Sequence, residues 1–173
     1  NTSFFLSRRA DDFDFMQRAA ETVQGSGDGF EPDAAECARL NELAASNRRE
    51  RYLPLALGAE KKQATLYETQ RPECASIYPP LENLADRFPQ LGAIRNKTSH
   101  SISLTTLDSW WEEEERPHIS FIKLDTQGSE LDILKGAENL LVDCLGCEVE
   151  VEFSPLYQNQ PLFSDVDTFL RHR

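Results

Sequence analysis

The stretch from Ile119 to Ala137 constrains the fold more than any other part of the sequence. An apolar run with aromatic and β-branched side chains, residues 121–124, predicts a strand that is covered on both faces. Asp125 follows where this run stops, and Gly128 permits a tight turn. Apolar residues then recur at helical spacing, at Leu131, Leu134, Ala137 and Leu141. The segment therefore predicts a strand, a turn and a helix, with Asp125 at the strand end where α/β proteins bind ligands.

The residues around this turn admit both structural and chemical interpretations. Ser129 is expected to cap the helix, with Asp132 as its capping-box partner. Glu130 falls in the first turn, where the helix dipole favours an anion. On spacing alone, a structural role is as well supported as a functional one for both acids: Asp125 as a residue that forms the turn, and Glu130 as a charge at the start of the helix. Lys123 is expected to find an anion, and it would hold Asp125 in its charged form.

A second acid follows an apolar segment at Phe30. We expect a short strand to end there, with Glu31 at its tip, because Pro32 cannot continue a central strand. Asp33 would cap the next helix, with Glu36 completing a capping box. In Rossmann-like folds an acid at this place accepts hydrogen bonds from ribose hydroxyls. The alternative is that Glu31 is an exposed side chain in a turn.

Three carboxylates alternate with apolar residues in the segment 147–153, which is strand-like. Glu148, Glu150 and Glu152 would share one face, and burying like charges is costly. Either that face is wet or the later glutamates reach the open end of the sheet. We favour the second interpretation for Glu150 and Glu152, because functional sites tolerate such costs.

The remaining pattern indicates a single domain over residues 1–173. Residues 1–24 are expected to form a helical segment, Gly25–Gly29 a flexible loop, and residues 71–100 an irregular insertion or lid rich in proline. Strands that alternate with helices imply an α/β fold with a mostly parallel central sheet flanked by helices.

Composition limits the partners. The net charge of −12 and the pI of about 4.7 argue against nucleic acid and against anionic membrane surfaces. No apolar run approaches the length of a membrane span. Four cysteines do not make a disulfide framework, so a reducing, cytoplasmic location is expected. Cys144 and Cys147 supply only half of a zinc site, and no metal is expected.

Taken together, these segments resemble the FkbM-type methyltransferases. The resemblance is carried by five stretches, namely residues 30–33 (FEPD), 53–58 (LPLALG), 106–110 (TLDSW), 121–137 (FIKLDTQGSE…LKGA) and 150–163 (EVEFSPLY…QPLF). It implies a Rossmann-like methyltransferase fold that uses S-adenosylmethionine and transfers a methyl group to a hydroxyl oxygen of a small molecule or sugar. It also implies that Glu31 binds the cofactor ribose, that Ala56 and Leu57 lie beside the adenine, and that Asp125 faces the methionine part or the acceptor.

Catalysis is assigned first to Asp125, which would orient the acceptor or take its proton, and second to Glu130 or Glu150. The family's glycine-rich cofactor turn normally lies well upstream of the ribose-binding acid, whereas here only Gly25 to Gly29 precede Glu31. Gly25 and Gly27 are the candidates for cofactor contact, and the first strand and the closing C-terminal strand pair are expected to be incomplete. A non-catalytic relative that has lost cofactor binding is the alternative. The sequence does not fix an oligomeric state.

Overall fold

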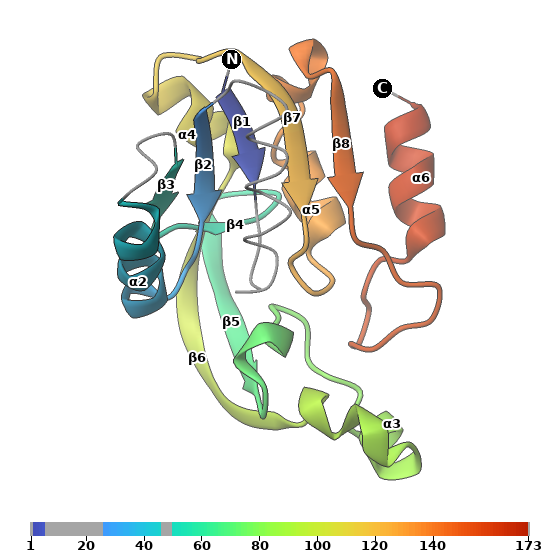
Figure 1. The fold of residues 1–173 in the computed structure, drawn as a ribbon. Coiled ribbons are helices and arrows are strands. Elements are labelled where there is room, and N and C mark those ends of the chain that lie inside the picture. Colours follow the sequence, from blue (N-terminus) through green and yellow to red (C-terminus); the bar gives the residue numbers. More distant parts are fainter. Residues whose placement is uncertain (1, 6–25, 46–49, 173) are drawn as a thin grey trace.

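The structure is a computed structural model that describes residues 2–5, 26–45 and 50–172 (Figure 1). Its larger sheet has five strands in the order β3-β2-β1-β7-β8. All four strand pairs in this sheet are parallel. The bounds are β1 Thr2–Phe5, β2 Ser26–Phe30, β3 Glu50–Leu53, β7 Ile119–Leu124 and β8 Gly146–Val149. The strand arrowheads therefore point to one edge of the sheet, as Figure 1 shows.

The smaller sheet has three strands in the order β4-β6-β5, with β4 Ala56–Leu57, β5 Lys62–Thr69 and β6 Asn96–Thr105. β4 and β6 are parallel, whereas β5 and β6 form a long antiparallel pair. These two strands extend away from the larger sheet beyond the carboxyl ends of its strands (Figure 1). The molecule is thus mixed α/β, and the antiparallel pair departs from the alternation of strands and helices that the sequence suggests.

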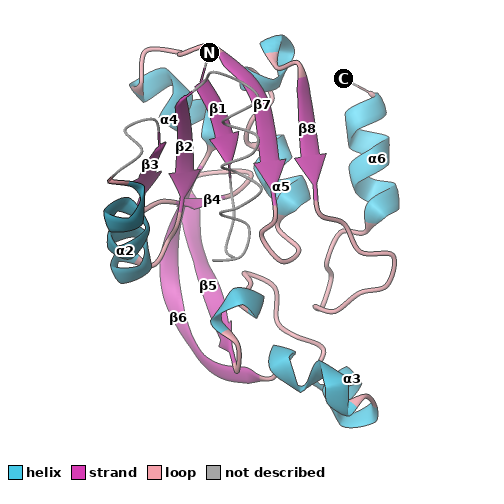
Figure 2. Ribbon diagram, viewed as in Figure 1, coloured by secondary structure: helices cyan, strands magenta, loops and turns pink. Residues whose placement is uncertain are grey.

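Short helices connect and cover the strands (Figure 2). The α-helices are α2 Ala34–Ala44, α3 Glu82–Arg87, α4 Leu107–Glu113, α5 Glu130–Lys135 and α6 Phe163–Arg171. The 3-10 helices are η2 Pro72–Cys74, η3 Pro89–Ile94 and η4 Leu140–Asp143. The expected insertion therefore contains η2, α3 and η3 and runs into the first half of β6.

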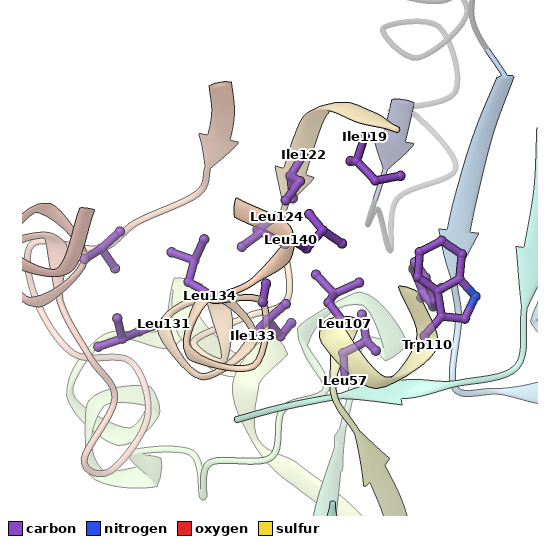
Figure 3. Packing of buried hydrophobic residues seen from close by; sticks show 13 residues of the cluster. Leu57, Leu107, Trp110, Ile119, Ile122, Leu124, Leu131, Ile133, Leu134 and Leu140 are labelled. Atoms are coloured by element: carbon purple, nitrogen blue, oxygen red, sulfur yellow. The ribbon is translucent and has the colours of Figure 1, made fainter. Parts of the chain in front are cut away.

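One apolar cluster joins the larger sheet to its helices (Figure 3). Ile119, Ile122 and Leu124 of β7 pack with the buried residues of α4 and α5, as the apolar run and the helical spacing predict. Phe30, at the end of β2, meets Trp110 edge-on with a ring-centroid distance of 5.1 Å. The cluster therefore fixes the strand ends of β2 and β7 relative to one another, and the acids that follow them.

The helix starts were predicted in part. Asp33 caps α2, because its Oδ1 accepts the Glu36 backbone N–H at 2.7 Å. Ser129 does occupy the position before α5, but its side chain caps nothing and instead donates to Thr126 Oγ1 at 2.9 Å. The capping box with Asp132 is therefore wrong.

Three predictions about chain segments are wrong for a physical reason. Residues 26–29 were expected in a flexible loop but form most of β2, because strands on both sides supply hydrogen-bond partners that outweigh the flexibility of glycine. β1 lies inside the segment expected to be helical, of which residues 6–24 lie outside the described part. β1 also occupies the centre of the sheet. The last strand stops at Val149, so Glu150 and Glu152 follow it and share no face with Glu148.

In the described part of the chain, no helix combines the length and the apolar character that crossing a membrane requires.

Gly136 provides a test of the packing between α5 and the smaller sheet. An added Cβ would collide with the carbonyl oxygen of Gly58 and press against Thr106. We expect Gly136→Ala to lower the free energy of unfolding by about 1–3 kcal/mol or more, as overpacking does. Urea unfolding monitored by circular dichroism measures this loss. Gly92→Ala is the matched control, because nothing lies within 4 Å of its added Cβ; equal effects in both variants would contradict the close approach.

Candidate functional site

Acidic residues follow three strands at the carboxyl edge of the larger sheet. Glu31 comes after β2, Asp125 after β7 and Glu150 after β8. β1 lies between β2 and β7, so Glu31 and Asp125 flank the end of one central strand on the same edge. Both residues are buried, each 7% exposed. Glu31 is therefore no exposed turn residue.

Glu31 is held at the start of α2. Its Oε1 accepts the Asp33 backbone N–H at 2.9 Å, and its own backbone N–H donates to the Leu53 carbonyl oxygen at 2.9 Å. Asp33 in turn caps the helix. The carboxylate of Glu31 is thus fixed by the backbone between β2 and α2, beside the carboxyl end of the sheet.

The turn after β7 is built around the Glu130 carboxylate. Its Oε1 accepts the Thr126 backbone N–H at 2.6 Å, and its Oε2 accepts the Gly128 backbone N–H at 2.9 Å. The turn has left-handed backbone at Gln127 (φ 57°) and at Gly128 (φ 102°), a conformation that is costly for a residue with a side chain. Burial raises the pKa of Glu130, although these hydrogen bonds act to lower it. With both oxygens already accepting hydrogen bonds, Glu130 holds the turn together and is poorly suited to the proton transfer expected of it.

Gln127 connects two of the predicted site carboxylates. Its Nε2 donates to Glu150 Oε2 at 3.0 Å and approaches Asp125 Oδ1 at 3.4 Å. Its Oε1 lies 3.4 Å from the Tyr157 hydroxyl, which is fully buried and donates to the Cys74 carbonyl oxygen at 2.8 Å. Gln127 and Tyr157 lie within the stretches that carry the family resemblance, but neither was predicted as a site residue, because a glutamine in a turn and an isolated tyrosine carry no spacing signal.

Lys123 finds an anion on the neighbouring strand, as the sequence predicts. It stands opposite Glu148 in the register of β7 and β8, and its Nζ lies 3.4 Å from Glu148 Oε1. This pair explains how a strand buried on both faces accommodates a lysine, since the ammonium group reaches a partly exposed anion.

The insertion is anchored to the turn. Ser76, 1% exposed, donates its hydroxyl to the Gln127 carbonyl oxygen at 2.6 Å and accepts the Tyr78 N–H at 3.1 Å. The Tyr78 hydroxyl donates to Asp132 Oδ2 at 2.6 Å. Both burial and Asp132 raise the pKa of Tyr78, in that order. The part of the insertion next to the turn is therefore a fixed wall of the site.

Residues after β8 form a second wall. The Leu81 N–H donates to the Leu156 carbonyl oxygen at 2.9 Å, and the Gln158 N–H donates to the Pro79 carbonyl oxygen at 2.7 Å. The insertion and the segment 150–162 are thus tied to one another as well as to the turn. Segments far apart in the sequence enclose the turn that carries Asp125.

Two neighbouring cavities lie at this edge. The larger, about 860 Å³, is lined by Glu31, the start of α2, η2 and the facing residues of β5 and β6. The smaller, about 30 Å³, is lined among others by Ala56, Leu57 and Asp125. Pro32 and Ile102 line both cavities. The larger volume falls in the range of small-molecule pockets, about 300–1,000 Å³.

The predicted cofactor residues do not all line the same cavity. Glu31 borders the larger cavity, whereas Ala56, Leu57 and Asp125 border the smaller one. Gly27 pairs with Ser3 and Glu50 inside β2 and therefore does not form the cofactor turn expected of it. Gly25 lies outside the described residues.

Ser76 offers a test of the anchored insertion. Ser76→Ala leaves a buried carbonyl oxygen and a backbone N–H without their partner, so we expect a loss of about 1–3 kcal/mol in the free energy of unfolding. Urea unfolding and the rate of limited proteolysis within residues 71–97 measure it. Ser154→Ala, at an exposed position, is the control; unchanged proteolysis in Ser76→Ala would show that the hydroxyl does not hold the segment.

A comparison with family models gives a match to the methyltransferase FkbM domain over residues 7–173. No curated protein and no solved structure matches the chain. Because the match spans nearly the whole sequence and includes all three strand-end acids, the chain belongs to the family of proteins with a methyltransferase FkbM domain.

Proposed function

We propose that the protein transfers a methyl group from S-adenosylmethionine to a hydroxyl oxygen of a small molecule or sugar. The observation that carries the proposal is the burial of Glu31 and Asp125 on one edge of the sheet, on either side of β1 and next to the cavities. The parallel strand order β3-β2-β1-β7-β8 supports a Rossmann-like methyltransferase fold, in which ligands bind at this edge.

The chemistry of the residues at this edge supports the cofactor assignment. The Glu31 carboxylate, fixed at the end of β2, would accept hydrogen bonds from the ribose hydroxyls. Ala56 and Leu57 offer buried apolar surface to the adenine. The small cavity beside them holds about one water molecule, so an adenine ring there requires Pro32 or Ile102 to shift. Asp125 would face the methionine part of the cofactor or the acceptor.

The bound cofactor supplies a methyl group on a cationic sulfonium. Asp125 and its neighbouring carboxylates would provide a negative environment that favours this cation. The walls formed by the insertion and by residues 150–162 would exclude water and align the acceptor with the methyl group. A carboxylate at this edge would accept the proton that the acceptor hydroxyl loses.

Glu31 provides the test of cofactor binding. We expect Glu31→Gln to weaken the affinity for S-adenosylmethionine by about 10–100-fold, because hydrogen bonds to a charged acceptor contribute about 1.5–3 kcal/mol. Isothermal titration calorimetry measures the dissociation constant. Glu42→Gln, an exposed position on the same helix α2, should bind like the wild type. If the wild type gives no binding heat and no protection against unfolding, the non-catalytic alternative holds.

Asp125 provides the test of chemistry. The formation of S-adenosylhomocysteine with a panel of sugars, phenols and small alcohols identifies an acceptor. We expect Asp125→Asn to lower kcat by about 10²–10⁴-fold, the range typical of proton-transfer or orienting groups. Asp143→Asn is the matched control, because Asp143 is exposed and precedes β8 at the opposite edge of the sheet. Wild-type turnover by Asp125→Asn would refute the assignment.

A further inference from the structure

One face of the antiparallel pair β5–β6 forms a wall of the larger cavity. Leu66 and His100 are direct partners in the register of the two strands, and Glu68 and Ile102 each lie two positions further along their own strands. Side chains two positions apart point to the same face of a strand, so these four residues share one face. All four line the larger cavity, whose volume is about 860 Å³. The pair of strands therefore contributes directly to the candidate site.

This wall combines apolar surface with a carboxylate that a ligand can reach. Leu66 is buried and Ile102 is partly buried. His100 Nδ1 lies 3.4 Å from Glu68 Oε1, and these two side chains are 49% and 40% exposed. Among the described residues, no group donates a hydrogen bond to the other carboxylate oxygen of Glu68. The wall thus offers a hydrogen-bond acceptor beside an apolar surface.

The two strand-end acids assign different parts of the cofactor to the two cavities. Glu31 lines the larger cavity, whereas Asp125 lines only the smaller one. In S-adenosylmethionine the base and the sulfonium are attached to different carbons of the ribose. With the ribose at Glu31 and the methionine part toward Asp125, as proposed above, the larger cavity is left for the base.

The available space leads to the same assignment. The smaller cavity, about 30 Å³, holds about one water molecule. The larger cavity falls in the range of small-molecule pockets, about 300–1,000 Å³. A purine ring therefore needs no movement of Pro32 or Ile102 in the larger cavity, whereas the smaller one requires it.

The charges around the larger cavity favour a base that donates hydrogen bonds. Its lining carboxylates outnumber its lysine and arginine side chains; the carboxylates are Glu31, Asp33, Glu36, Glu68 and Glu73, and the cations are Arg71 and Lys97. The exocyclic amine of adenine donates hydrogen bonds to such acceptors. The carbonyl oxygen that hypoxanthine has in the same place would find no donor at a carboxylate.

We propose that the larger cavity is the adenine subsite of the protein, an inference that rests on the proposed use of S-adenosylmethionine. The base packs against Leu66 and Ile102, and its exocyclic amine donates to the carboxylate of Glu68. Ala56 and Leu57 are then separated from the base by Pro32 and Ile102, which line both cavities.

Selectivity between two cofactor analogues tests the role of Glu68. By isothermal titration calorimetry, the wild type should bind S-adenosylhomocysteine about 10-fold more tightly than S-inosylhomocysteine, or more, because the carbonyl oxygen of the second lacks a donor. Glu68→Gln supplies an amide that either donates or accepts, so the ratio of the two dissociation constants should fall below about threefold. A ratio that stays within twofold of the wild-type value would overturn the assignment.

Glu60→Gln is the matched control for charge. It removes the same charge at an exposed position just before β5, and Glu60 lines neither cavity. The ratio of the two dissociation constants should equal that of the wild type. An equal fall in Glu60→Gln and Glu68→Gln would assign the preference to net charge and would overturn the contact with Glu68.

Photolabelling locates the base without reference to turnover. A derivative of S-adenosylmethionine with an azido group on carbon 8 of the adenine should label residues 62–75, which include β5 and η2. Label confined to residues 53–58 would place the base beside Ala56 and Leu57 and would overturn the subsite. If the wild type binds neither S-adenosylmethionine nor S-adenosylhomocysteine, the proposed function fails together with this inference. Binding of S-adenosylhomocysteine without preference over the inosine analogue removes only the adenine subsite.

Discussion

The carboxylate of Glu130 and the two backbone N–H groups that it accepts support the rest of the site. They stabilise a turn with two consecutive left-handed residues, one of which, Gln127, has a side chain. Three interactions of Gln127 offset the unfavourable backbone conformation of the turn. Its backbone carbonyl oxygen accepts a hydrogen bond from the Ser76 hydroxyl, and its side-chain amide nitrogen donates to the Glu150 carboxylate. Its side-chain amide oxygen lies 3.4 Å from the Tyr157 hydroxyl. Without the carboxylate, the insertion and the segment after β8 would lose their common attachment point.

A second constraint is the concentration of negative charge. Asp125, Glu130, Glu150 and Glu152 lie at one edge of a sheet in a protein whose net charge is already −12. Such a cluster persists only when each charge is compensated. Backbone N–H groups compensate Glu130, and the amide of Gln127 serves Glu150 and Asp125. Burial and the negative charges of Glu130 and Asp125 raise the pKa of Glu152 to about 7. A bound cation would relieve the whole cluster, in agreement with the proposed sulfonium ligand.

Sequence reasoning succeeded where a signal is local. The ends of β2 and β7, the cap at Asp33 and the apolar stripe of α5 all follow from spacing within a few residues. It failed where neighbours decide the structure. The glycines before Phe30 form a strand because β1 and β3 pair with it. The hydrogen bond from Ser76 to Gln127 spans 51 positions, and that from Tyr157 to Cys74 spans 83, so no periodicity could indicate them.

The ionisation of Glu152 is unfavourable in the folded protein, which bears on whether this edge of the sheet has a functional role. A raised pKa means that the ionised side chain is less favourable in the folded protein than in the unfolded chain, so above neutral pH Glu152 opposes folding. A glutamine there would avoid this cost and would leave the hydrogen bonds of the turn untouched, because Glu152 makes none of them. A carboxyl group whose ionisation is opposed by burial and by the charges of Glu130 and Asp125 is more consistent with a ligand-binding edge than with a domain that only folds.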